Sequence, residues 1–174
     1  YTTLFLDRDG VINHKIDGYV QYLGEFNFID GVLEVFPKLT DYFDRILIVT
    51  NQQGIGKGLM TDKDLLNLHD QMKVKIENSG GRIDKIYFCP HLAEEKCNCR
   101  KPQPGMLLQA KSDFTEIDFK KELEEGNFPR VIDYLQIDLY TENRSTLTTL
   151  ENIDRDVLDH YAFSTITLEH DFYA

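Results

Sequence analysis

The segment Leu6-Asp7-Arg8-Asp9-Gly10 places two carboxylates, one residue apart, directly after a short apolar run. One carboxylate of such a pair can attack phosphorus, because an acyl-phosphate intermediate divides hydrolysis into two easier steps. The other can protonate the leaving oxygen and later activate water, which typically contributes about 10²- to 10⁴-fold in rate. The pattern therefore suits phosphate-ester hydrolysis, and its alternative is a charged turn at a strand end.

Further groups that could bind a phosphate follow along the chain. Thr50 and Asn51 offer a hydroxyl and an amide, and the glycines after them expose backbone N–H groups. Lys101 would add positive charge beside a transferring phosphoryl group, and Arg100 could hold a second anionic group. A hard, oxygen-bound cation, best matched by Mg²⁺, would offset the crowded negative charge. The alternatives are a polar turn at Thr50 and a solvated basic pair at Arg100 and Lys101.

All three cysteines lie in one short stretch, Cys89-Pro90-His91 followed by Cys97-Asn98-Cys99. Three thiolates and one imidazole match the ligand set of a closed, tetrahedral structural Zn²⁺ site. We predict that Cys89, His91, Cys97 and Cys99 bind zinc, with buried free thiols as the alternative. The other histidines, among them His69, have no comparable neighbours in sequence and are interpreted as surface or core residues.

Apolar runs at Thr2–Leu6, Arg45–Val49 and Ile83–Cys89 end in polar or glycine-rich segments, which predicts three buried strands. Helical periodicity separates them, so the order strand, helix, strand, helix, strand predicts an α/β fold with a parallel sheet. The polar groups then gather at the carboxyl ends of the strands, where such sheets bind ligands.

Two helices should connect the strands. The first is expected from Gly31 to Phe43, kinked or restarted at Pro37; its apolar face comprises Val32, Val35, Phe36, Leu39 and Phe43. The second should begin at Thr61, with Asp64 completing a capping box. Its core stripe comprises Leu65, Met72 and Ile76.

The composition of the chain argues against some classes of binding partner. The net charge of −11 over 174 residues disfavours a phosphate-backbone binder, so nucleic acid is not expected as a partner. No apolar run approaches the roughly 20 residues that span a bilayer, and no signal peptide is recognised at the start. Three cysteines cannot all pair in disulfides within one chain, which suits a reducing compartment, so we expect a cytoplasmic protein. We also expect a monomer that acts on a small-molecule phosphate ester.

These motifs resemble, in order, the first three motifs of the haloacid dehalogenase (HAD) superfamily, within it the heptose 1,7-bisphosphate and histidinol-phosphate phosphatases. The resemblance covers residues 1 to about 120 and implies a HAD-like Rossmannoid sheet with helices on both faces and a zinc-binding loop. It implies Asp7 as nucleophile and Mg²⁺ ligand, and Asp9 as general acid/base with its carbonyl on Mg²⁺. It also implies Thr50 and Asn51 on the phosphate and Lys101 as charge stabiliser.

The sequence departs from that family after Lys120. The fourth motif, a strand ending in Gly-Asp with a second Asp nearby, does not arrive, and acidic residues dominate the rest. Asp133 and Asp138 have a plausible spacing, but residues five apart on one strand point to opposite faces.

We therefore predict two parts, a phosphatase domain over 1–120 and an acidic α/β tail over 121–174 that could complete the sheet. The tail resembles part of an FkbM-type methyltransferase in Ile132–Asp138 and Thr165–His170, without its cofactor strand. It could be a natural fusion, or the chain could be a composite that lacks a middle section.

Several functions follow from these features. The leading hypothesis is a phosphatase for heptose 1,7-bisphosphate, favoured over histidinol phosphate by Asn13, Gly18, Tyr19 and the Gln-Pro-Gly-Met after Pro102. The alternatives from other classes are a non-catalytic module that binds phosphate esters and a methyltransferase fragment.

Overall fold

Three parallel strands form the sheet that carries the polar segments. In the computed structural model they are β1 (Thr3–Leu6), β2 (Arg45–Asn51) and β3 (Lys85–Cys89), in the spatial order β1-β2-β3. Leu6 pairs with Ile48, and Asn51 pairs with Cys89. The predicted strands are confirmed, although β3 begins two residues later than expected.

The structure describes residues 3–117, 131–132, 135–138, 162–163 and 166–169. The chain divides into two compact units, Tyr1–Glu122 and Leu123–Ala174. The three-stranded sheet belongs to the first unit.

Side chains of β2 alternate between two hydrophobic clusters, because successive residues of a strand point to opposite faces. Ile46 and Ile48 pack with residues of the first two helices, whereas Leu47 and Val49 pack with residues of the third. All four are buried. Both faces of the sheet are therefore covered, which fixes the register of β2.

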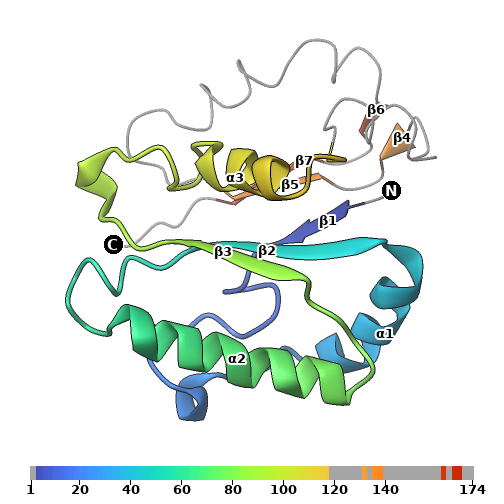
Figure 1. The fold of residues 1–174 in the computed structure, drawn as a ribbon, viewed down its shortest axis with the longest axis horizontal. Coiled ribbons are helices and arrows are strands. Elements are labelled where there is room, and N and C mark those ends of the chain that lie inside the picture. Colours follow the sequence, from blue (N-terminus) through green and yellow to red (C-terminus); the bar gives the residue numbers. More distant parts are fainter. Residues whose placement is uncertain (1–2, 118–130, 133–134, 139–161, 164–165, 170–174) are drawn as a thin grey trace. The chain divides into compact units, whose positions relative to one another are not determined.

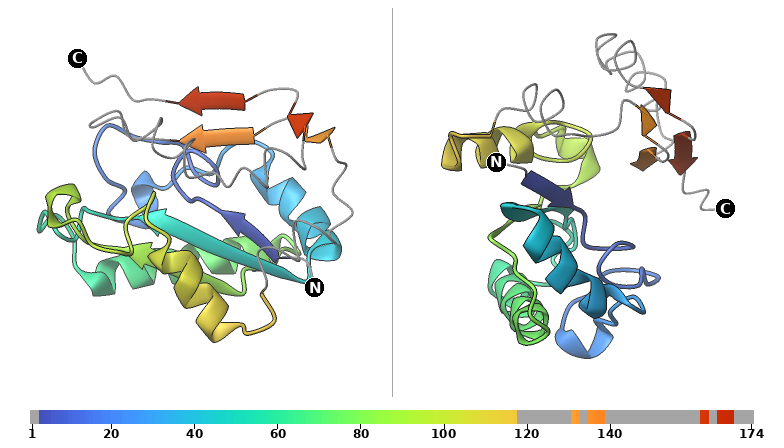
Figure 2. Two further views of the ribbon diagram at one scale, coloured as in Figure 1. Left: turned by 90° about the horizontal axis from the view of Figure 1, so that it is seen from above. Right: turned by 90° about the vertical axis from the view of Figure 1, so that its right-hand side faces the viewer.

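Helices cover the two faces unequally. The helices α1 (Val32–Tyr42) and α2 (Asp62–Asn78) lie on one face, and α3 (Gly105–Asp113) lies on the other (Figures 1 and 2). Two short 3₁₀ turns, η1 (Leu23–Glu25) and η2 (Ala93–Glu95), lie in the connections. The predicted α/β fold, a parallel sheet with helices on both faces, is confirmed.

The helix α1 differs from its prediction in two respects. It continues through Pro37 as one helix of 11 residues. The expected restart is wrong: Pro37 removes only the backbone hydrogen bond to the carbonyl of Leu33, and the hydrogen bonds on either side keep the helix continuous. Val35, expected in the core, is 45% exposed, whereas Phe36 is buried.

The helix α2 begins as predicted. Thr61 is its N-cap, and the reciprocal hydrogen bonds with Asp64 form the capping box. Leu65, Met72 and Ile76 are buried as expected, and the buried face also includes Leu68 and His69.

The second unit contains short parallel pairs. The strand β4 (Val131–Ile132) pairs with β6 (Ala162–Phe163), and β5 (Leu135–Asp138) pairs with β7 (Ile166–Glu169). The stretch from Val131 to Leu139, which has the pattern of a single strand, thus contributes two strands with different partners. Asp133, Thr165 and His170 lie outside the described residues. Within the described ranges of the chain, no helix has the length and apolarity needed to cross a membrane.

Candidate active site

Asp7 stands directly after β1, at the carboxyl edge of the sheet. Its Oδ1 accepts a hydrogen bond from the backbone N–H of Arg8 at 2.7 Å, and its Oδ2 lies 2.7 Å from Nζ of Lys101. The Asp7 side chain is 27% exposed and that of Lys101 is 33% exposed. The fold thus brings the predicted nucleophile and the predicted charge stabiliser together, and leaves both accessible to a small ligand.

Asp9 is held more tightly than Asp7. Its Oδ1 accepts hydrogen bonds from Nη2 of Arg8 at 2.8 Å and Nδ2 of Asn13 at 3.0 Å. Its Oδ2 accepts from Nε2 of Gln52 at 2.7 Å. Burial alone would raise the pKa of Asp9, but the charge of Arg8 and the three donors outweigh it and lower the pKa below its usual value. The carboxylate is therefore ionised at neutral pH.

A tight turn after Asp9 brings Asn13 back to it. Gly10 adopts a φ of +85°, in the left-handed region that favours glycine. Its N–H donates to the carbonyl of Asn13 at 2.8 Å, and the carbonyl of Arg8 accepts from the N–H of Ile12 at 2.8 Å. Asn13 is fully buried as a result.

Arg8 is a buried cation, only 1% exposed, and its guanidinium forks onto Asp9. Its Nη1 lies 3.2 Å from Nε2 of His69 on α2. Burial and the nearby charge of Arg8 lower the pKa of His69 to about 3, although Asp9 acts in the opposite direction. The imidazole is therefore neutral, and because arginine has no acceptor, Nε2 of His69 accepts the hydrogen bond.

Thr50 and Gln52 extend this buried network from the end of β2. Nε2 of Gln52 donates to Oγ1 of Thr50 at 3.0 Å as well as to Asp9. The backbone N–H of Gln52 donates to the carbonyl of Cys89 at 2.7 Å, which ties the loop to β3. Thr50 is only 1% exposed, so its hydroxyl can act on a ligand only from inside the network.

Asn51 uses its side chain on the backbone of Lys101. Its Oδ1 accepts from the Lys101 N–H at 2.9 Å, and its Nδ2 donates to the Lys101 carbonyl at 3.2 Å. This reciprocal pair links the end of β2 to the segment that carries the ammonium group. Asn51 thus positions Lys101, which the motif alone did not indicate, while its predicted contact with phosphate stays a prediction. Arg100 is partly exposed beside Lys101.

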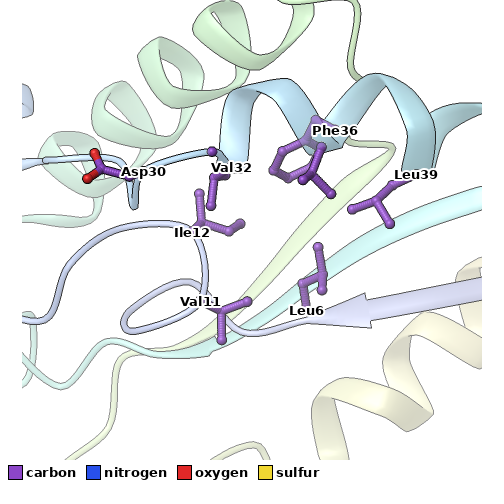
Figure 3. Close-up of a pocket in the computed structure, with 9 residues that line it drawn as sticks. Leu6, Val11, Ile12, Asp30, Val32, Phe36 and Leu39 are labelled. Atoms are coloured by element: carbon purple, nitrogen blue, oxygen red, sulfur yellow. The ribbon is translucent and has the colours of Figure 1, made fainter.

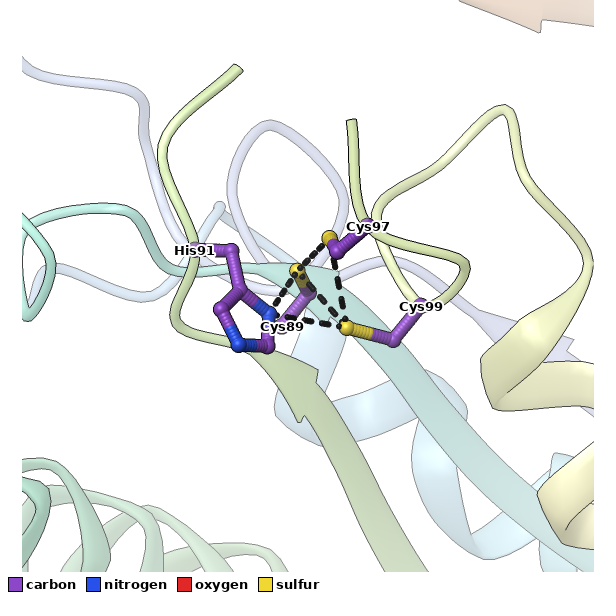
Figure 4. A group of neighbouring side chains, drawn as sticks. All are labelled: Cys89, His91, Cys97 and Cys99. Carbon is purple, nitrogen blue, oxygen red and sulfur yellow. Dashed lines mark hydrogen bonds between the residues drawn. The ribbon is translucent and has the colours of Figure 1, made fainter. Parts of the chain in front are cut away.

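The four residues predicted to bind zinc converge after β3 (Figure 4). Sγ of Cys89 lies 3.5 Å from that of Cys97 and 3.1 Å from that of Cys99, and Nδ1 of His91 lies 3.1 Å from Sγ of Cys99. Zn–S bonds of about 2.3 Å place the sulfurs of a tetrahedral site about 3.8 Å apart, so the sulfurs need to separate by only a few tenths of an ångström to admit the ion. The donor set therefore fits a zinc ion.

The thiols differ in their tendency to ionise. Burial raises the pKa of Cys89 to about 12. For Cys97 the same effect is outweighed by hydrogen bonds, from Cys89 and from the backbone N–H of Arg100, and the pKa falls to about 7. Gly105, the first residue of α3, packs on this loop, because a Cβ there would clash with the carbonyl oxygen of Asn98.

An apolar cavity of about 290 Å³ lies between α1 and the loop after β1 (Figure 3). Aliphatic and aromatic side chains line it, with Asp30 as its charged residue: Leu6, Val11, Ile12, Val32, Val35, Phe36 and Leu39. This lining does not suit a phosphate group, because it offers no cation. We therefore locate the candidate site at Asp7 and Lys101.

For magnesium, the described residues offer fewer ligands than for zinc. Within those residues, the cysteine and histidine cluster is the one group of three or more metal-binding side chains. At this site the resemblance implies two ligand oxygens, one from the Asp7 carboxylate and one from the Asp9 carbonyl. Mg²⁺ accepts such a set, since it commonly keeps several waters and takes one or two carboxylates plus substrate phosphate.

Sequence reasoning missed Arg8, Asn13 and Gln52 as partners of Asp9, and His69 as the partner of Arg8. One signal was present, because His69 falls on the same helical face as Leu65 and Met72, at spacings of four and three residues. A histidine on a core stripe needs a buried partner, but the sequence does not say which one.

Comparison with known proteins places these motifs in a family. The family profile described as polynucleotide kinase 3 phosphatase matches residues 6–128. A D-glycero-beta-D-manno-heptose-1,7-bisphosphate 7-phosphatase of Yersinia pestis is 44% identical over 118 residues, covering 63% of this chain and 62% of the relative. A D-glycero-alpha-D-manno-heptose-1,7-bisphosphate 7-phosphatase of Mycobacterium tuberculosis (strain ATCC 25618 / H37Rv) is 42% identical over 106 residues, covering 60% and 56%. The chain thus spans less than two thirds of the length of these curated relatives.

Solved structures share the fold. The D,D-heptose 1,7-bisphosphate phosphatase from B. bronchiseptica, complexed with magnesium and phosphate, matches with a TM-score of 0.64 at 24% identity, over 94% of this chain and 92% of that one. A HAD-like phosphatase from Mesorhizobium loti matches with a TM-score of 0.57 at 26% identity, over 64% and 56%.

Proposed function

The chain belongs to the polynucleotide kinase 3 phosphatase family, within the HAD superfamily, and we propose that it hydrolyses a small phosphate monoester through an aspartyl-phosphate on Asp7. One observation carries this proposal. The Asp7 carboxylate is partly exposed at the sheet edge, with the ammonium of Lys101 2.7 Å from its Oδ2. A phosphoryl group that approaches Asp7 therefore meets a positive charge.

In the first step, a carboxylate oxygen of Asp7 attacks phosphorus and the bond from phosphorus to the ester oxygen breaks. Protonated Asp9 gives its proton to the leaving oxygen. In the second step, Asp9 as carboxylate takes a proton from water, the water oxygen attacks phosphorus, and the bond to Asp7 breaks to release phosphate. Asp9 is ionised in the free protein, which is the state that the second step requires. A bound phosphate dianion raises the pKa of Asp9 by like-charge repulsion, which favours the first.

Two metals belong to the proposal. Magnesium would be held by the Asp7 carboxylate and the Asp9 carbonyl, and when bound it would neutralise charge on the phosphoryl oxygens. The magnesium and phosphate in the B. bronchiseptica enzyme support magnesium as the cation, while the two ligands are part of the proposal. Zinc would be held by Cys89, His91, Cys97 and Cys99, and it would stabilise the loop between β3 and α3.

Heptose 1,7-bisphosphate is the substrate we propose, with Thr50, Asn51 and Arg100 as contacts. The names of the relatives support it, and the range matched by the family profile, residues 6–128, includes Asp7, Thr50 and Lys101. Histidinol phosphate is the comparison substrate, since it carries a single phosphate on an amino alcohol.

Phosphate release with Mg²⁺ from both esters tests the proposal. The wild type should release phosphate, preferably from heptose bisphosphate, and Asp7→Asn should release none. Asp41→Asn, which removes an exposed carboxylate from α1, is the control and should retain full activity. Equal inactivity of wild type and Asp7→Asn would contradict the proposal, and tight ester binding without turnover would instead indicate a non-catalytic binding module.

A further inference from the structure

The guanidinium of Arg8 contacts a different partner on each of its two sides. On one side Nε and Nη2 donate to Asp9, with Nη2 reaching Oδ1 at 2.8 Å and Oδ2 at 3.0 Å. On the other side Nη1 reaches Nε2 of His69 at 3.2 Å. Because the Arg8 side chain is 1% exposed, water cannot readily replace either partner. The position of Arg8 therefore depends on both contacts.

His69 is itself fixed from three sides. It lies on the buried face of α2, next to Leu68, and is 3% exposed. Its ring packs edge-to-face on Phe88 of β3, with centroids 6.1 Å apart. The imidazole thus links α2 and β3 to the guanidinium of Arg8. Phe26, whose ring centroid lies 5.9 Å from Cζ of Arg8, borders the same guanidinium.

We propose that His69 is a positioning residue, which holds the Arg8 guanidinium through Nε2 and thereby fixes the orientation of the Asp9 carboxylate. The proposal rests on the proposed function, in which Asp9 transfers the proton. Loss of the acceptor leaves a buried N–H of Arg8 without its partner, so the guanidinium shifts and Asp9 moves with it. A displacement of about 1 Å at a proton-transfer group can cost about 10²-fold in rate.

Two amide variants separate positioning from packing. His69→Gln places its amide oxygen near the position of Nε2, whereas His69→Asn is too short to reach Arg8. We expect kcat of His69→Gln within about threefold of wild type and kcat of His69→Asn lowered at least 10-fold, as expected for a displaced proton-transfer group. KM should change less than twofold in both variants, since the side chain at position 69 is buried and does not contact the ester. Equal kcat values for the two variants would overturn the proposal.

A further variant serves as a control that separates an effect on stability from an effect on turnover. Leu68→Ala removes buried volume next to His69 and keeps the imidazole that accepts from Arg8, so it should lower the melting temperature but leave kcat per folded molecule unchanged. A fall in kcat with Leu68→Ala equal to that with His69→Asn would show that loosening of α2 explains the loss, and would overturn the proposal.

A measurement without substrate distinguishes this proposal from the proposed function. The ¹⁵N–¹H signals of the Arg8 side chain should be slow to exchange in wild type and in His69→Gln, and broadened in His69→Asn. Identical signals in all three would contradict the positioning role whether or not the wild type hydrolyses an ester. An inert wild type with the expected signals would contradict the proposed function alone.

Discussion

Asp9 and the cysteine cluster are both polar groups near the carboxyl end of the sheet, but their charges are balanced in opposite ways. The Asp9 carboxylate has its counter-charge within the fold, from Arg8, together with donors from Asn13 and Gln52. The thiols of the cluster contact mainly one another and the imidazole of His91. Asp9 therefore needs no ion to remain charged and ordered, whereas the cluster gains most from a bound dication.

The largest effect on activity is expected at Lys101, whose ammonium group lies beside the partly exposed carboxylate of Asp7. Lys101→Met removes the ammonium group 2.7 Å from Asp7 and keeps much of the side-chain volume. Loss of one such charge-stabilising group should lower kcat by about 10²- to 10³-fold, or about 3–4 kcal/mol of transition-state stabilisation. Steady-state phosphate release measures it. Lys63→Met on α2 is a control with an exposed lysine, and equal losses in the two variants would contradict the assignment.

Removal of one cysteine should act on stability. Cys99→Ser should abolish zinc binding and lower the free energy of unfolding by about 2–3 kcal/mol, because ligand binding contributes directly to folding. Metal analysis and thermal unfolding, with roughly 2–4 °C expected per kcal/mol, measure both effects. A chelator should lower the melting temperature of wild type and leave Cys99→Ser unchanged. Wild type that contains no zinc when purified without chelator would contradict the prediction.

The neutral histidine beside Arg8 predicts acid sensitivity. The pKa of His69 is about 3 in the folded protein and about 6.5 when unfolded, so the unfolded chain binds the extra proton between these values. The contribution of neutral His69 to the free energy of unfolding is therefore fully present above pH 6.5. It is lost as the pH decreases below that value, by about 2 kcal/mol between pH 7 and pH 5. The lowered pKa of Asp9 acts only below its usual value of 3.8.

Urea unfolding of wild type and His69→Gln at pH 7 and pH 5 isolates this contribution. The variant should lose about 2 kcal/mol less than wild type over this range, because glutamine does not titrate. Parallel losses in the two proteins would show that His69 is protonated in the folded state or that other groups dominate.

The smallest effect is expected at Asn51. Asn51→Ala removes both hydrogen bonds to the backbone of Lys101, so the ammonium group is held less firmly. We expect about a 10-fold loss in kcat, or about 1.4 kcal/mol, smaller than for Lys101→Met because the charge itself remains. Asn67→Ala, on the exposed face of α2, should change nothing. A loss as large as that of Lys101→Met would indicate that Asn51 also contacts the phosphate.

Local patterns determined much of this protein. The three strands, the capping box at Thr61 and the cysteine cluster were predictable, because each depends on residues close in sequence. The four zinc-binding candidates fall within one loop, so their spacing largely fixes their geometry. The continuous helix through Pro37 and the exposure of Val35 were not predicted, since both depend on where the helix begins and how it rotates against the sheet.

The sequence by itself determined that two carboxylates follow a buried strand and that a lysine and a polar strand end accompany them. Only the tertiary structure decided which groups touch: Lys101 with Asp7, Asn51 with the backbone of Lys101, and His69 with Arg8. The physical reason is distance along the chain. Residues within one turn or loop meet through local geometry, whereas these pairs meet only after strand register and helix rotation are fixed by the packing of the two hydrophobic clusters.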